Sequence, residues 1–355
     1  MAELLRDTVS ALLADDADDT RDEAARYGWS PGLWDRLAAA GLTLVAVPDA
    51  AGGSGGTLRD LAVLLHACGY HAAPVPLLEN ALAAGALAAA GRPVPPGPLV
   101  VVPRAAAAVA IDGSGRRATG RLPDVAWARA GRQVVLLTAM PEPPGHPVLA
   151  MIDPGDCVVE PGTNIAGEPR DALLLPDDGV ACTPLTTGDG PEDLTLRGTL
   201  GRALLMNGSL RRVLDLTVRY AGEREQFGRP IGRFQAVQQQ LAALAGTVEQ
   251  AGAIADLAVS AVERDERAAE AVMAAKICAG HAAAVAIAVG HQVHGAIGFT
   301  VEHELHRHTR RLMAWRDEDG SESQRAAELG ARVTGAGPGG LWELLTGRPA
   351  AGAAR

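Results

Sequence analysis

Residues 224–239 read REQFGRPIGRFQAVQQ, and this stretch decides the fold expected of the chain. Arg224 and Phe227 lie three residues apart, so a helix would place them on one face, and Gly228 and Pro230 would end that helix. A guanidinium offers forked donors suited to a pyrophosphate, and an aromatic ring can cover an apolar or ring-shaped part of a ligand. The alternative interpretation is a helix-capping cation beside a phenylalanine packed in the core.

A second informative stretch, residues 291–311, reads HQVHGAIGFTVEHELHRHTRR. Gly295 and Gly298 permit a close approach of the backbone to a ligand, because glycine has no Cβ. The histidines of this stretch alternate with glutamates, but HExH lacks the pair of histidines one helical turn apart that HExxH provides. We therefore expect no metal site.

The composition indicates a folded protein and argues against several functional classes. The chain has 355 residues, of which 48% are hydrophobic, enough for two or three packed units. The net charge of −10 argues against general nucleic-acid binding. The 4 cysteines are scattered without a CxxC motif, which predicts neither a zinc site nor disulfides and fits a reducing cytoplasm. The amino terminus does not resemble a signal peptide, and the apolar runs are too short and alanine-rich to predict a membrane span.

The spacing of apolar residues predicts an α+β protein of several domains. Residues 1–98 have helical spacing, residues 99–188 carry short β-branched runs between prolines and glycines, and residues 189–335 show long helices typical of a four-helix bundle. Residues 336–355 are predicted to be a disordered tail. The glycine-rich loop VPDAAGGSGGT lacks the Lys-Ser/Thr of a phosphate-binding loop, and Thr57 with Asp60 predicts a capping box instead.

The two stretches together resemble the C-terminal helical domain of acyl-CoA dehydrogenases, and the resemblance covers nearly all of residues 20–335. It implies that family's fold, with an N-terminal helical domain, a small β-domain and a C-terminal four-helix bundle. It also implies FAD as cofactor and α,β-dehydrogenation of an acyl-CoA thioester. In the family, these segments reach across a subunit interface to the FAD of a neighbour. The resemblance assigns cofactor contacts to Arg224, Phe227, Gln235, Gln292, Gly295, Ala296, which replaces a family glycine, and Ser321, which replaces a threonine.

The resemblance also bears on the catalytic base, a carboxylate that must remove a proton from the carbon next to the thioester. Counted nine residues from Arg310, the family's glutamate position falls on Asp319, which is one methylene shorter and should lose much of the rate. Glu318 could substitute only if the loop rearranged, and an alternative family position falls near Gly198, which has no side chain. The other interpretation of Asp319 is a turn residue before Gly320 in a solvated charged run.

The predicted β-domain lacks both family segments that cradle the flavin ring. There is no Thr-Glu-Pro-x-x-Gly-Ser-Asp and no Trp-(Ile/Phe)-(Thr/Ser), and Trp127 is interpreted as a packed aromatic at the start of a strand. The chain thus keeps what a family subunit lends to its neighbour and has altered what a subunit uses for its own site. Residues 41–80 and 294–308 resemble actinobacterial acyl-CoA dehydrogenases that act as α2β2 heterotetramers on bulky side chains such as those of sterols.

We therefore expect the FAD-completing subunit of a heteromeric acyl-CoA dehydrogenase, with an acyl-CoA substrate, an electron-transfer acceptor and a second dehydrogenase-like subunit. Two alternatives stay open. The first is a self-sufficient enzyme, such as a homo-oligomer, that uses Asp319 as base in dehydrogenation or in a related redox-neutral reaction of an acyl thioester. The second is a structural or regulatory subunit that binds no flavin.

Overall fold

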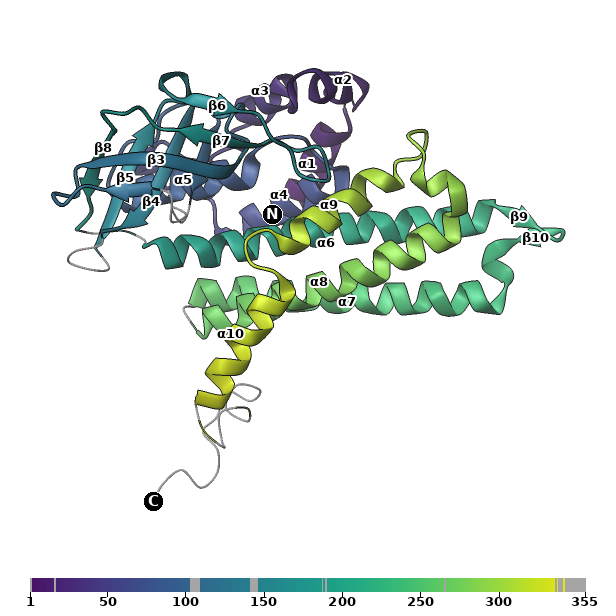
Figure 1. Ribbon diagram of the computed structural model, residues 1–355. Helices are drawn as coiled ribbons and strands as arrows, with labels where there is room; N and C mark the ends of the chain where they lie inside the picture. The colour runs from purple at the N-terminus through teal and green to yellow at the C-terminus, as the bar shows by residue number, and fades with distance from the viewer. Residues whose placement is uncertain are drawn as a thin grey trace.

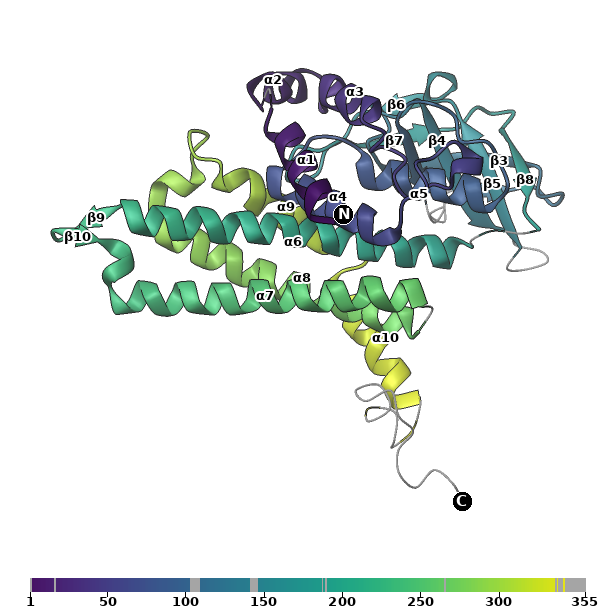
Figure 2. The ribbon, with the colours of Figure 1, turned by 180° about the vertical axis from the view of Figure 1, so that it is seen from behind.

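The computed structural model has helices at the amino terminus, a β-sheet in the middle of the chain and a bundle of long helices after it (Figure 1). It describes residues 2–15, 17–102, 109–140, 146–186, 188, 190–264, 266–335, 337 and 341. The predicted tail, residues 336–355, lies outside these residues except for positions 337 and 341. The sheet and the amino-terminal helices lie over one half of the bundle, and the other half extends beyond them (Figures 1 and 2).

The amino-terminal helices begin at residues that satisfy their first backbone amides. Ser30 accepts a hydrogen bond from the amide of Leu33 at the start of α3. At the start of α4, Thr57 and Asp60 each accept from the other's amide, which confirms the predicted capping box. The helices are α1 (Ala2–Ala14), α2 (Ala17–Tyr27), α3 (Pro31–Ala39), α4 (Leu58–His71) and α5 (Leu77–Ala89), with a 3₁₀ turn η1 (Asp49–Ala51).

The strands form one sheet in the order β1-β4-β5-β8-β3-β7-β6, and β2 pairs with β3. β1 runs parallel to β4, and the other pairs are antiparallel. The strands are β1 (Leu99–Val102), β2 (Val109–Ile111), β3 (Arg117–Ala126), β4 (Gln133–Ala139), β5 (Pro147–Ile152), β6 (Val158–Glu160), β7 (Arg170–Leu174) and β8 (Val180–Pro184), with a 3₁₀ turn η2 (Pro154–Asp156).

The short β-branched runs LVVVP, AVAID, QVVLLTAM, PVLAMIDP and CVVEPG predict β1, β2, β4, β5 and β6, and no such run predicts β3, β7 or β8. β3 carries polar residues and Pro123, and its register with β7 shifts between Leu122 and Val125, so it lacks a regular alternation. Trp127 is packed, at 3% exposure, but the prediction that it starts a strand is wrong. It follows the last residue of β3 in a turn with φ 59°, where its amide bonds the carbonyl of Pro169.

The carboxyl-terminal helices lie side by side (Figures 1 and 2). The first of them, α6, also packs closely on the amino-terminal helix α4 through small residues. A Cβ on Gly208 would lie 2.0 Å from the carbonyl oxygen of His66, and a Cβ on Gly69 would lie 1.9 Å from that of Leu205, so α4 and α6 meet backbone to backbone. The elements are α6 (Pro191–Glu223), β9 (Glu225–Gln226), β10 (Arg229–Pro230), η3 (Ile231–Arg233), α7 (Gln235–Arg264), α8 (Ala268–His294), η4 (Gly295–Phe299), α9 (Leu305–Asp317) and α10 (Glu322–Gly335).

Apolar side chains from all three parts fill the interior. The largest cluster joins the amino-terminal helices to the bundle and includes Leu37, Leu64 and Leu210. A second cluster packs on the sheet around Leu136, and a third packs α5 against the sheet through Leu87. Because α5 contacts both β1 and α6, the sheet is held against the bundle through this helix.

One helical segment of the described chain, Ala268–Phe299, is long and apolar enough to cross a membrane, with a mean hydropathy of 1.8. The expectation that the apolar runs are too short to predict a membrane span is therefore wrong for this segment, as judged by length and composition. In the most apolar 18-residue part of this segment, 50% is buried inside the protein. α8 contacts α6, α7, α9 and α10, and a helix surrounded by other helices is apolar on most faces.

The close contact between α4 and α6 makes Gly208 and Gly222, two of the glycines of α6, unequal. Gly208→Ala should lower the free energy of unfolding by about 1–3 kcal/mol, because its Cβ would clash with the backbone of α4. A Cβ on Gly222 would meet no atom within 4 Å, so Gly222→Ala should raise the free energy of unfolding by about 0.5–1 kcal/mol, since alanine favours helix. Urea unfolding of both variants measures the difference, and equal changes would contradict the backbone contact.

Candidate functional site

The first predicted site segment forms a hairpin at the end of α6. The helix ends at Glu223, and the amide of Ile231 bonds the carbonyl of Arg224 to close β9 and β10. Phe227 and Gly228 form the turn with φ of 54° and 77°, the two positive values that a tight two-residue hairpin turn requires. The prediction that Arg224 and Phe227 share a helix face is therefore wrong, because the helix ends before both.

Phe227 projects from the tip of this hairpin. Its exposed fraction is 92%, so the alternative of a core phenylalanine is also wrong. Its ring meets Phe234 edge to face at 6.1 Å, and Arg229 lies 4.3 Å over the ring of Phe234. A left-handed backbone at a non-glycine residue costs roughly 1–2 kcal/mol. An exposed aromatic ring held in this conformation is a candidate contact for a ligand or another subunit.

The predicted contacts in the second stretch, residues 291–311, lie at the same end of the bundle as the hairpin. Tyr220 near the end of α6 stacks on His294 at the end of α8, with ring centroids 4.5 Å apart. This brings the hairpin and the start of α7 together with the end of α8 and η4. We call the following set the bundle-end surface: Arg224, Phe227, Gln235, Gln292, Gly295 and Ala296, all of them exposed.

The bundle-end surface offers donors that the chain itself does not use. Within the described residues, the side chains of Arg224, Gln235 and Gln292 form no hydrogen bond or ion pair. Gly295 has φ 64°, and a Cβ there would meet nothing within 4 Å, so its backbone faces open space. A free guanidinium, two carboxamides and an open glycine backbone fit the diphosphate and polar edges of FAD.

Ser321 lies apart from this surface. It is in the turn between α9 and α10, where its amide donates to Gln324 Oε1 at 2.9 Å and its hydroxyl lies 3.1 Å from that of Ser323. Its backbone and side chain are thus engaged at the start of α10. The structure brings together six of the predicted cofactor contacts and leaves Ser321 beside Asp319.

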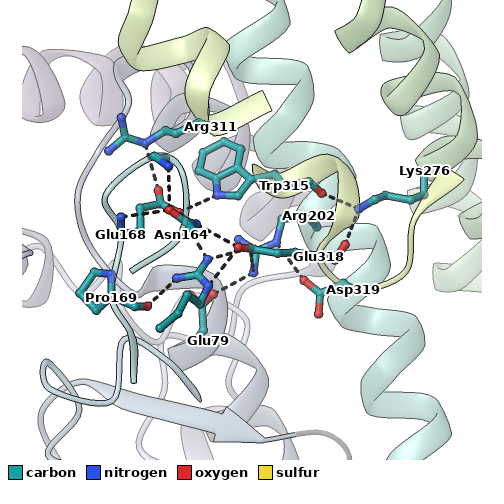
Figure 3. Close-up of polar contacts among 12 residues, drawn as sticks. Glu79, Asn164, Glu168, Pro169, Arg202, Lys276, Arg311, Trp315, Glu318 and Asp319 are labelled. Carbon is teal, nitrogen blue, oxygen red and sulfur yellow. Dashed lines mark hydrogen bonds and ion pairs between the residues drawn. The ribbon is translucent and has the colours of Figure 1, made fainter. Parts of the chain in front are cut away.

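Asp319 is held by a buried arginine of α6 (Figure 3). Arg202 is 5% exposed, and its Nε lies 2.8 Å from Asp319 Oδ2. The same guanidinium lies 3.0 Å from Glu79 Oε1 of α5 and 3.4 Å from Glu318 Oε2. A Cβ on Gly198 would lie 3.1 Å from Asp319 Oδ1, so the two family positions for the base are neighbours, and one is empty of side chain.

The ion pairs continue from Glu318 into the sheet. Arg170, at the start of β7, lies 2.7 Å from Glu318 Oε2 and 3.4 Å from Glu168 Oε2. Glu168 is 3% exposed and accepts from Arg311 at 3.0 Å and from the indole of Trp315 at 2.9 Å. We call the following set the Arg202 network: Glu79, Glu168, Arg170, Arg202, Lys276, Arg311, Trp315, Glu318 and Asp319. Figure 3 labels all of them except Arg170.

Lys276 of α8 binds the backbone at the end of α9 and in the turn that contains Asp319. Its side chain is fully buried, and its ammonium donates to the carbonyl of Trp315 at 2.7 Å and to that of Glu318. Burial lowers the pKa of Lys276 to about 8, and attraction to Asp319 offsets part of that effect.

The charges around Asp319 hold it as a carboxylate. Burial by itself raises the pKa of Asp319, but Arg202 and then Lys276 more than compensate, so this pKa lies below its usual range. A general base works best with a pKa near the operating pH. Residues 318–320 do form a turn after α9, but the expected solvation is wrong for Glu318 and Asp319, whose side chains are only 21% and 19% exposed. The catalytic role of Asp319 stays a prediction.

Comparison with known proteins identifies the family. The acyl-CoA dehydrogenase N-terminal domain matches residues 1–94, and the acyl-CoA dehydrogenase C-terminal domain matches residues 196–333. The acyl-CoA dehydrogenase IpdE2 of Mycobacterium tuberculosis is 30% identical over 313 residues, which are 87% of this chain and 90% of that protein. This chain belongs to the acyl-CoA dehydrogenase family.

Other acyl-CoA dehydrogenases agree in sequence and in structure. FadE27 of M. tuberculosis is 33% identical over 78% of this chain and 81% of its own length. The ChsE4-ChsE5 complex of M. tuberculosis contains a chain with a TM-score of 0.83 and 25% identity, covering 94% of this chain and 97% of that one. The Tcur3481-Tcur3483 steroid acyl-CoA dehydrogenase variant gives a TM-score of 0.83 at 28% identity, covering 94% and 98%. The protein is thus an FAD-dependent oxidoreductase of the acyl-CoA class.

Sequence reasoning missed the Arg202 network in this acyl-CoA dehydrogenase. A signal was present, because Glu79, Arg202 and Lys276 each stand alone among apolar residues of a predicted helix. A charged side chain on such a face is either exposed or paired, and residues of opposite sign on different helices are candidate partners for one another. Only the packing of the helices shows which of them meet.

Lys276→Met isolates the titration of the buried ammonium. Its folded pKa of about 8 lies below the usual 10.5, so between these values the unfolded chain binds more protons than the folded one. The stability of the unchanged protein should therefore rise relative to the variant as pH rises through this window, by at most about 1.4 kcal/mol per pH unit. Denaturant unfolding at several pH values measures the difference, and a constant difference from pH 7 to 10.5 would contradict it.

Proposed function

We propose that this chain is the subunit of a heteromeric acyl-CoA dehydrogenase that lends its bundle-end surface to the FAD of a partner subunit. The observation that carries the proposal is the contrast between the two ends of α6. At its carboxyl end Arg224 is exposed and unpaired within the described residues, and in its amino-terminal half Arg202 ties up the acid in register with the family's base. The similar ChsE4-ChsE5 structure is a complex of two named components, which supports a heteromer here.

The bundle-end surface would act by binding and positioning the cofactor. Arg224 supplies two parallel N–H donors for the diphosphate, and Gln235 and Gln292 supply amide donors and acceptors for its polar edges. Phe227 covers an apolar part of the cofactor or of the partner. FAD supplies the hydride acceptor when it is bound. The same proposal divides the chain into three domains, residues 1–98, 99–188 and 189–335. The complex would act in the cytoplasm on a bulky, steroid-like acyl-CoA.

A self-sufficient enzyme that uses Asp319 is the second candidate, favoured by the register of this residue. The Arg202 network argues against it, since a paired carboxylate with a lowered pKa is a poor proton acceptor near neutral pH. The visible spectrum of the chain purified alone separates the two candidates. Bound FAD that bleaches with an acyl-CoA substrate would contradict a dependent subunit. So would full flavin content and activity of the partner without this chain.

Arg224→Ala tests the cofactor contact in the assembled complex. Losing a charge-assisted hydrogen bond worth about 1.5–3 kcal/mol should weaken FAD retention roughly tenfold or more. Arg211→Ala is the matched control, because Arg211 is likewise an exposed arginine but pairs with Glu249 at 2.9 Å. Flavin absorbance per complex after gel filtration is the measurement. Equal FAD content in both variants would remove the diphosphate role of Arg224.

Asp319→Asn separates a structural carboxylate from a catalytic one. Under the proposal the variant loses about 1–3 kcal/mol of stability, because Arg202 keeps a buried charge with one partner fewer, and kcat of the complex changes little. If Asp319 is the catalytic base, its replacement should instead lower kcat by about 10²-fold or more. Asp317→Asn, an exposed neighbour, serves as control. Thermal unfolding and steady-state kinetics on both variants decide between the roles.

A further inference from the structure

An open polar cavity of about 430 Å³ lies beside the bundle, and its lining includes none of the residues assigned above to FAD. Three elements supply its walls: α2, the last turns of α6, and the segment that leads into the first turn of α9. The lining residues are Arg21, Arg219, Glu302, His303, Glu304 and Arg307. His303 packs edge to face on Tyr220 at 6.3 Å, which anchors this wall to α6.

The glutamates of this cavity do not balance its arginines. Three arginines against two glutamates leave a net charge of +1 among the lining residues. Glu304 already accepts two hydrogen bonds from Arg212, at 2.8 and 3.0 Å, and Arg212 is not part of the lining. With both Arg212 and Asp18, the partner of Arg21, counted, four arginines face three acids, and the excess stays at +1.

Arg307 carries the clearest part of this excess. Its side chain has no hydrogen bond or ion pair to another residue of the described ranges. Burial first, and then repulsion from Arg21, lower the pKa of Arg307, and attraction to Glu304 offsets only part of this. Arg21 itself pairs with Asp18, whose side chain is 87% exposed, and such surface pairs contribute little. Both guanidinium groups line the same cavity, so an anion held between them would attract both.

We propose that this cavity binds the phosphoryl group of a phosphate-bearing ligand. Guanidinium groups from three separate elements suit an anion with several terminal oxygens and two charges better than a planar carboxylate. Arg307 lies in the first turn of α9, where the helix dipole adds partial positive charge. The volume is in the range of ligand sites and leaves room for more than the phosphoryl group. This site is additional to the bundle-end surface and does not depend on the proposed FAD role.

Isothermal titration of the full chain at constant ionic strength tests the proposal, with inorganic phosphate, ADP and coenzyme A as separate titrants. Arg21→Gln and Arg307→Gln should each weaken binding about tenfold, since each removes a charge-assisted contact. Arg26→Gln is the matched control, because Arg26 lies on the same α2 helix, stacks over Tyr27 at 5.0 Å and does not line the cavity.

The outcomes separate the sources of the phosphoryl group. Equal affinity for inorganic phosphate, ADP and coenzyme A would show that the cavity recognises the phosphoryl group alone. Tighter binding of ADP or coenzyme A would show that it recognises a nucleotide. Affinity unchanged in the Arg21→Gln/Arg307→Gln double variant, or lost equally in Arg26→Gln, overturns the site. Circular dichroism of each variant confirms that the fold is kept. Flavin content of the complex should stay at the unchanged level in both cavity variants, so a failure here is distinct from a failure of Arg224 to hold FAD.

Discussion

The guanidinium of Arg202 is the contact on which the arrangement of the three parts depends. It is 5% exposed, and it meets Glu79 of the amino-terminal helices and the acids of the turn that joins α9 to α10. Glu318 of that turn passes the contact on to Arg170 of the sheet at 2.7 Å. A buried charge without partners would cost several kcal/mol, so helices, sheet and turn must come together in one arrangement to satisfy it. The apolar clusters drive the packing, and this network selects which packing is reached.

Such a network restricts the chemistry available at the turn. The same carboxylate cannot both neutralise a buried arginine and wait as a proton acceptor with a raised pKa, because the arginine stabilises its charged form. Burial raises the pKa of Glu79, partly offset by Arg202, and Asp319 is shifted in the opposite direction. Acids that share one cation thus titrate differently, because Asp319 is also attracted by Lys276 whereas Glu79 is repelled by Asp319. At this turn the pairing with Arg202 and Lys276 wins for Asp319.

The two ends of α6 are built on opposite principles. Around Arg202, most polar groups have a partner inside the chain, as burial demands. At the bundle-end surface, Arg224 and the two glutamines have none within the described residues, and Phe227 is 92% exposed. Exposed groups do not pay for burial, so they are free to serve a ligand or a second subunit. The long helix between them keeps the two regions apart and fixes their relative orientation.

The sequence alone determined the family, the order of helical and β segments and the capping box at Thr57. It also predicted cofactor contacts, six of which the structure gathers at the bundle-end surface. These depend on local spacing and on short motifs, which survive in the linear chain. Local spacing failed at Arg224–Phe227, where a hairpin replaced the expected helix, and at β3, where polar residues and Pro123 break the alternation. Only the tertiary structure decided that Arg202 faces Asp319, that Lys276 is buried beneath the turn and that Ser321 lies far from the other predicted contacts. Those facts depend on which faces of separate helices meet, and residues 117 positions apart, such as Arg202 and Asp319, leave no mark of that meeting in a single sequence.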